Sequence, residues 1–110
     1  VSIVLADGAP KLFLGHDKVE VIANSGKPIE IKNDKARLVL AANGDITLAG
    51  ENVTITAKQS LKIEGNQVET SSKATTKVAS GGQLELKASG PAKLQSSAIT
   101  EVKGSMVKVN

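Results

Sequence analysis

The chain has 110 residues and a net charge of +3, from 14 Lys and Arg against 11 Asp and Glu. It has no cysteine, which excludes disulfides and thiolate metal sites, and its only aromatic residue is one Phe. A compact monomeric core normally depends on aromatic side chains, which bury about 150–250 Å² each. The composition therefore favours a thin, repetitive core over a globular one.

Basic and acidic residues interleave along the sequence, which is typical of a solvated surface. A nucleic-acid interface would need clustered basic residues and stacking aromatic side chains, and the sequence has neither. No apolar run approaches the roughly 20 residues of a membrane-spanning helix. We therefore expect neither nucleic-acid binding nor insertion of a helix into a membrane.

Residues 1–43 contain five short runs of alternating apolar and polar residues, without helical periodicity. Long corners such as residues 23–27 interrupt them. We expect this part to be a less regular β-helical transition region, continuous with residues 44–110 and not a separate domain. The same-face apolar pairs of its runs are Ile3/Leu5, Leu12/Leu14, Val19/Val21, Ile29/Ile31 and Leu38/Leu40.

Residues 44–110 repeat with a period of seven or eight residues, and such self-similarity outranks any single motif in assigning a fold. Each repeat has two same-face residues, mostly aliphatic, with a polar residue between them. Because side chains alternate between the two faces of a strand, one edge should face inward and the other water. The same-face pairs are Ile46/Leu48, Val53/Ile55, Leu61/Ile63, Val68/Thr70, Thr76/Val78, Leu84/Leu86, Ala92/Leu94, Thr100/Val102 and Val107/Val109.

Short corners of two or three residues separate these runs. Glycine and asparagine gather there, and both tolerate the positive φ of a sharp bend, so we expect bends of that kind. The corner residues are Gly44, Gly50, Gly65, Gly81, Gly82, Gly90, Gly104, Asn52 and Asn66.

A repeat with one strand and one bend cannot bury its own apolar edge. A monomeric β-solenoid takes about three strands per turn and normally has a repeat of roughly 20 residues or more, and no longer loop recurs here at every third strand. Three chains wound about a common axis would pair every backbone group and leave almost no free edge. The predicted fold is therefore an all-β, intertwined trimeric triple-stranded β-helix.

The trimer core should be built by the large aliphatic residues of the same-face pairs. After Ile63 the inward set becomes smaller and more polar, with Thr70, Thr76, Ala92 and Thr100, which suggests water or ions on a narrow axis. The predicted core residues are Ile46, Leu48, Val53, Ile55, Leu61, Ile63, Val68, Val78, Leu84, Leu86, Leu94, Val102, Val107 and Val109.

Signals of catalysis or of a cofactor are weak. His16 is the only histidine, and three copies could bind a metal or an anion on a threefold axis, but its place in a corner favours a plain surface role. Asp7-Gly8 and Asn43-Gly44-Asp45 lack the spaced carboxylates of a calcium loop, and turn chemistry explains both. We expect no catalytic residues, no metal site and no cofactor, so the protein should not be an enzyme.

The stretch from residue 44 to residue 110 begins with Gly44-Asp45-Ile46-Thr47-Leu48 and closes with Lys103-Gly104-Ser105-Met106-Val107-Lys108-Val109-Asn110. It resembles the carboxy-terminal β-helical spikes of contractile phage tails, type VI secretion VgrG proteins and extracellular contractile injection particles. The resemblance implies a homotrimeric needle, assembled in the bacterial cytoplasm on a baseplate with hub and tube proteins upstream. Sheath contraction would then drive it through a target cell envelope.

The resemblance also implies a PAAR-type tip protein bound at the carboxy-terminal end. That surface would consist of Met106, Val107, Lys108, Val109 and Asn110. One phage subset carries a His-x-His metal motif near this end, and its absence here makes an iron-bearing point unexpected. The hub domains that family members carry upstream are missing, so the chain looks like a fragment.

The sequence therefore predicts a structural, envelope-puncturing needle. One alternative is a trimeric fibre or adhesin stem that acts as a spacer for a binding head. Another is a monomeric solenoid that binds carbohydrate, which the molar mass in solution would distinguish from both.

Overall fold

The computed structural model describes residues 11–110, and this part is all-β with no helix, which confirms the predicted class. Within it there is accordingly no helix that could cross a membrane. The chain divides into two compact units, residues 1–63 and residues 64–110. The run predicted at residues 1–5 lies outside the described residues.

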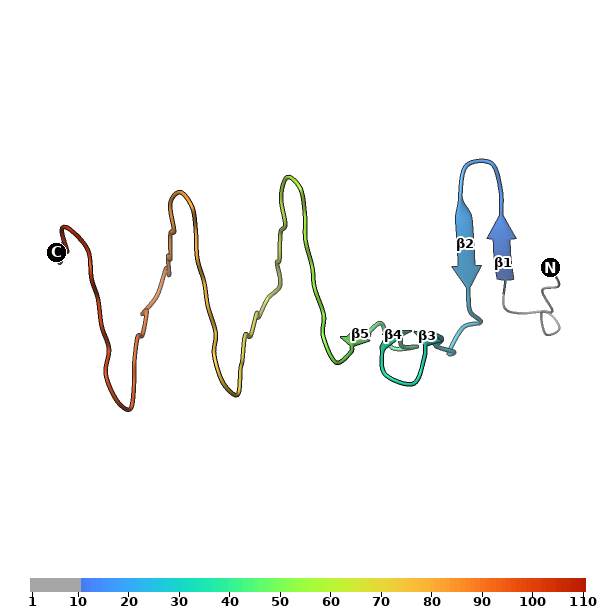
Figure 1. Ribbon diagram of the computed structural model, residues 1–110. Helices are drawn as coiled ribbons and strands as arrows, with labels where there is room; N and C mark the ends of the chain where they lie inside the picture. The colour runs from blue at the N-terminus through green and yellow to red at the C-terminus, as the bar shows by residue number, and fades with distance from the viewer. Residues whose placement is uncertain (1–10) are drawn as a thin grey trace. The chain divides into compact units, whose positions relative to one another are not determined.

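The first unit begins with an antiparallel hairpin of β1 (Lys11–Leu14) and β2 (Val19–Ile22), shown in Figure 1. In the loop that joins them, the Gly15 amide donates a hydrogen bond of 2.9 Å to the Lys18 carbonyl. The Phe13 ring lies so close to Gly15 that a Cβ there would come within 2.5 Å of it. Any other residue at the start of the loop would therefore require the exposed Phe13 ring to move.

A three-stranded antiparallel sheet comes next along the chain, formed by β3 (Ile29–Lys32), β4 (Arg37–Leu40) and β5 (Ile46–Ala49) in that order. All five strands fall within runs that the alternation of apolar and polar residues predicts. Their antiparallel pairing inside one chain was not part of the prediction, which sought partners in neighbouring chains. The tight turns explain the difference, because a short turn lets consecutive strands pair locally.

The turns of this sheet use specific side chains. At the β3–β4 turn the Asn33 side-chain oxygen accepts hydrogen bonds of 2.9 Å from the Lys35 and Ala36 amides. At the β4–β5 turn Gly44 has a φ of 96°, and its amide donates to the Ala41 carbonyl at 3.1 Å. Asn43-Gly44-Asp45 thus serves the turn, with the Asp45 amide donating to the Asn43 side chain at 3.1 Å.

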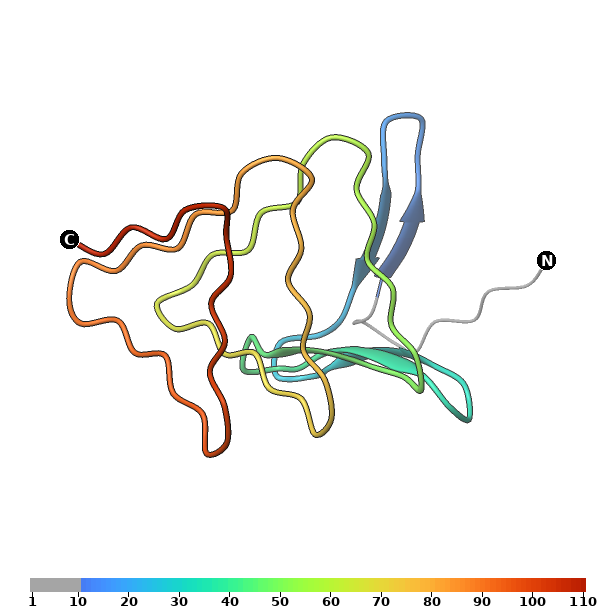
Figure 2. The ribbon, with the colours of Figure 1, turned by 60° about the vertical axis from the view of Figure 1, so that its left-hand side comes forward.

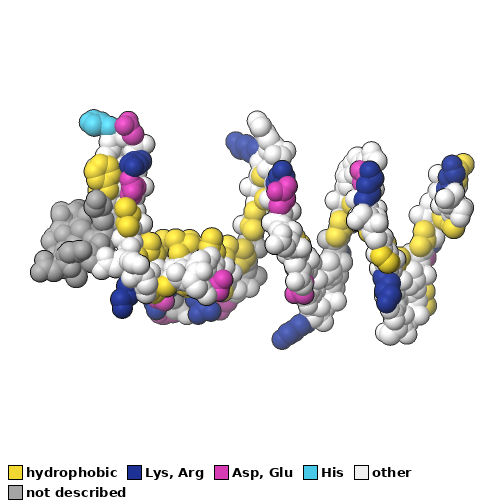
Figure 3. All heavy atoms as spheres, turned by 180° about the vertical axis from the view of Figure 1, so that it is seen from behind, with side chains coloured by type: hydrophobic (Ala, Val, Ile, Leu, Met, Phe, Trp, Pro, Cys, Tyr) yellow, Lys and Arg dark blue, Asp and Glu magenta, His cyan; other side chains and the backbone are white. Residues whose placement is uncertain are grey.

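One face of the three-stranded sheet is entirely aliphatic. The strand register aligns two rows across it, Ile29–Leu40–Ile46 and Ile31–Leu38–Leu48. These are three of the predicted same-face pairs, brought onto one surface. Figure 3 shows them as a continuous hydrophobic band, with charged side chains on the opposite side of the sheet.

From Gly50 to Asn110 the chain consists of extended runs joined by sharp bends, and no residue in this fully described stretch belongs to a paired strand. Successive bends are seven or eight residues apart, as the period predicts. Within residues 73–105 the chain returns to the same direction after three runs, as Figures 1 and 2 both show. The bends lie at residues 51–52, 58–59, 66–67, 73–74, 81–82, 89–90, 97–98 and 105–106.

The conformation predicted for the corners is wrong at most positions. Among the described residues only Gly26 and Gly44 have a positive φ, so of the nine predicted corner residues only Gly44 adopts it. The bends instead require a small side chain, because the residue just before each of the eight bends is Gly, Ala or Ser. At Gly65 and Gly104, an added Cβ would lie 3.1 Å and 3.0 Å from the carbonyl oxygen two residues later.

Serine at this position closes the bend with hydrogen bonds. The Ser80 hydroxyl donates to the Gln83 carbonyl at 2.9 Å and accepts from the Gly82 amide at 3.3 Å. The Ser72 hydroxyl does the same with Thr75 and Ala74, at 2.9 Å and 3.2 Å. These are turns in which a hydroxyl replaces a backbone partner.

Candidate assembly surface

The same-face pairs of the repeat keep a fixed position relative to the bends. The second member of each pair, from Leu48 to Val102, always lies three residues before the next bend. Leu86, for example, precedes the bend at Ser89–Gly90, and Val78 precedes the bend at Gly81–Gly82. Each run therefore presents its apolar pair at the same place.

Contacts between side chains two residues apart agree with alternating faces. The Glu85 carboxylate lies 3.2 Å from the Lys87 ammonium, and Glu101 lies 3.1 Å from Lys103. On another run the Gln67 amide donates to Glu69 at 3.1 Å. The polar residues of a run thus share one side, which leaves the other side to the apolar pair.

No hydrophobic residue of the described chain is buried. From Val53 onward the large aliphatic residues of the predicted core are 52% to 88% exposed, with Leu86 at 87% and Val109 at 88%. Large exposed apolar patches in proteins mark interaction surfaces, so these side chains are the candidates for one in each of the two units. We call these residues the apolar edge; it comprises the predicted core residues from Val53 to Val109.

The backbone of the same stretch belongs to no paired strand. Backbone amides and carbonyls that become buried need hydrogen-bond partners, and extended chain commonly finds them in a neighbouring strand. Within residues 64–110, runs that are three apart, such as 75–80 and 99–104, are not paired with each other. Each of these runs therefore lies outside any paired strand and carries its same-face pair with it.

The proposed tip residues form the last bend and the last run. Met106 lies in the bend at residues 105–106 and is 82% exposed, and Val107 and Val109 continue the apolar edge.

Sequence reasoning missed Ile99, which is 84% exposed and lies two residues before Glu101, on the polar side of its run. The alternation itself could have found it, because Ile99 breaks the polar pattern.

No group of three His, Asp or Glu side chains among residues 11–110 is placed to hold a metal ion. His16 is exposed in the β1–β2 loop. The predictions of no catalytic residue and no cofactor remain predictions.

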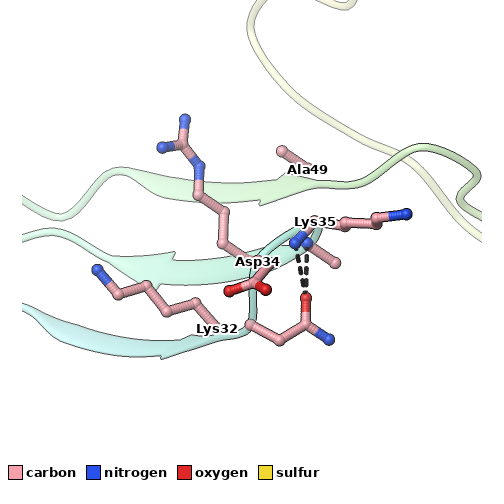
Figure 4. Close-up of a pocket in the computed structure, with 7 residues that line it drawn as sticks. Lys32, Asp34, Lys35 and Ala49 are labelled. Carbon is pink, nitrogen blue, oxygen red and sulfur yellow. Dashed lines mark hydrogen bonds between the residues drawn. The ribbon is translucent and has the colours of Figure 1, made fainter.

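A shallow depression of about 350 Å³ lies at the β3–β4 turn, shown in Figure 4. The charged residues that line it, Lys32, Asp34, Lys35 and Arg37, are all exposed. Lys32 is engaged with Glu30 at 3.0 Å. The depression is a consequence of the turn and its long side chains, and it has the character of open surface.

Comparison with protein-family models, with curated proteins and with solved structures finds no match for this chain.

Proposed function

We propose that three copies of this chain wind about a common axis into a triple-stranded β-helix, with the apolar edges of all three facing the axis. One observation carries the proposal: runs that recur every seven or eight residues in a constant register leave their aliphatic side chains exposed and lie outside any paired strand. Burial of a Leu or Ile side chain stabilises by about 1.5–3 kcal/mol. Three identical edges can bury one another without any further partner.

The backbone supports the same arrangement. A chain that returns to the same direction after three runs can leave room for two other strands between its own successive turns. Strands in a sheet lie about 4.8 Å apart, so a turn with two inserted strands has a rise of about 14 Å. Two further copies of the chain would fill these places and pair every run on both sides.

Such an assembly is a stiff rod. The eight runs from residue 53 to residue 109 would give a height of about 38 Å at the usual strand spacing. Together with the resemblance to spikes of contractile injection machines, this supports a structural role as an envelope-puncturing needle, assembled with a baseplate in the bacterial cytoplasm and then expelled.

At the carboxy-terminal end, residues 106–110 would receive a PAAR-type tip protein. The test is binding of such a protein to the full chain and to a chain that lacks residues 106–110, with molar mass measured for both. We expect the truncated chain to remain a trimer and to lose binding. Equal binding by both would contradict the tip assignment, and no binding by either would favour the stem that merely spaces a head.

A further inference from the structure

The residue at the centre of each same-face pair occupies a fixed place on the polar side of its run. From Lys62 to Glu101 this central residue always lies four residues before the next bend. Its charge alternates strictly along the chain, and of all the ways to order four lysines and three glutamates only one alternates throughout. The central residues are Lys62, Glu69, Lys77, Glu85, Lys93, Glu101 and Lys108.

Threefold winding decides which of these residues become neighbours. On one face of the rod, the strand next to a given run of one chain is the following run of a second chain, and on its other side lies the preceding run of the third. Parallel neighbours in register bring their central residues side by side. Lys77 of one chain would therefore lie between Glu69 and Glu85 of the other two.

Other arrangements give different neighbours. If neighbouring strands on a face were the same run of two chains, or runs two apart in the sequence, lysine would lie beside lysine. Like charges side by side destabilise a sheet, whereas opposite charges stabilise it. An offset of three runs also alternates the charges, but it belongs to a single chain coiled on itself. That coil requires hydrogen bonds between runs three apart, and the structure does not pair runs 75–80 and 99–104.

We infer that the central Lys and Glu residues form ladders of ion pairs between chains, one on each face of the rod, which set a stagger of one run between neighbouring chains. This inference rests on the proposed trimer. The apolar edge specifies a stagger less sharply, because every run contributes one or two aliphatic residues to it. The contacts of Glu85 with Lys87 and of Glu101 with Lys103 leave carboxylate oxygens for a second cation, since each carboxylate accepts several hydrogen bonds.

The first test reorders the charges without changing composition. The variant E69K/E85K/K93E/K108E places four lysines before three glutamates, and it should melt at least about 5 °C below the wild type in low salt. The difference should shrink by more than half in 1 M NaCl, where charges are screened within about 3 Å. A trimeric variant that melts like the wild type in low salt would overturn the ladder.

A milder pair of variants serves if the reordered chain does not assemble. K77E places three glutamates in succession, and K73E makes the same charge change in the bend at residues 73–74. We expect K77E to lower the melting temperature at least about twofold more than K73E, and equal shifts would contradict the ladder. A wild-type chain with the mass of one copy would instead overturn the trimer itself, so the two failures are distinguishable.

Discussion

Leu38 in β4 lies directly opposite Leu48 in β5, and Ile31 in β3 lies opposite Leu38 from the other side. Leu48 also belongs to the repeat, because it lies three residues before the bend at residues 51–52 like its equivalents in later runs. Leu48 therefore belongs both to the aliphatic face of the sheet and to the series of same-face pairs.

Replacing Leu38 tests whether the sheet face is covered. We expect Leu38→Ala to lower the free energy of unfolding by about 2–5 kcal/mol per chain, the usual cost for a buried leucine. Urea denaturation of the assembled protein measures it, with Thr47→Ala on the opposite face as the control. A cost below about 0.5 kcal/mol, typical of a surface position, would mean that the face stays in water.

Leu86 gives a sharper test, because it is 87% exposed in the single chain. An exposed leucine can be replaced at a cost of about 0.5 kcal/mol or less, whereas burial in a trimer predicts about 2–5 kcal/mol per chain for Leu86→Ala. The neighbouring Lys87→Ala, on the other side of the run, should change stability little. Similar effects of the two substitutions on chemical denaturation would contradict an inward-facing apolar edge.

The Ser80 hydroxyl makes two hydrogen bonds that hold the bend at residues 81–82. We expect Ser80→Ala to lower the free energy of unfolding by about 0.5–1.5 kcal/mol per chain, the net contribution of a typical hydrogen bond. Ser71→Ala, on the polar side of the preceding run, is the control. Thermal melts that place Ser80→Ala at or above the control would show that the hydroxyl does not hold the bend.

A large side chain just before a bend should lower the stability of the protein. Gly65→Val should lower stability by about 1–3 kcal/mol per chain, because a branched side chain would crowd the Gln67 carbonyl, 3.1 Å from an added Cβ. Gly65→Ser should be tolerated, since Ser72 and Ser80 occupy the same position at other bends. Calorimetry on both variants measures the difference, and a valine no worse than the serine would refute the steric explanation.

Hydrophobic alternation predicted much of the local structure. It located all five strands, and it chose the residues that align as Ile29–Leu40–Ile46 across the sheet. The period of seven or eight residues predicted the spacing of the bends as far as Ser105. These features depend on the residues of one run or one turn, so a local pattern is sufficient to find them.

Features that depend on chain geometry were harder to predict. Glycine in a corner suggested positive φ, but Gly65 and Gly104 serve bends that need a small residue and not a left-handed one. The alternation of residues within a strand also does not identify the strand that pairs with it, so the antiparallel sheet of β3, β4 and β5 was missed. For the same reason, the trimer core remains a prediction that depends on other copies of the chain.

The central claim is that three chains share one core, and molar mass in solution tests it most directly. Light scattering on the purified chain should give about 34 kDa, three times the 11.3 kDa of one copy, and the value should hold on dilution because separation requires breaking many strand pairs together. A folded chain with the mass of a single copy would contradict the account, because the apolar edge would then have to be satisfied within that copy.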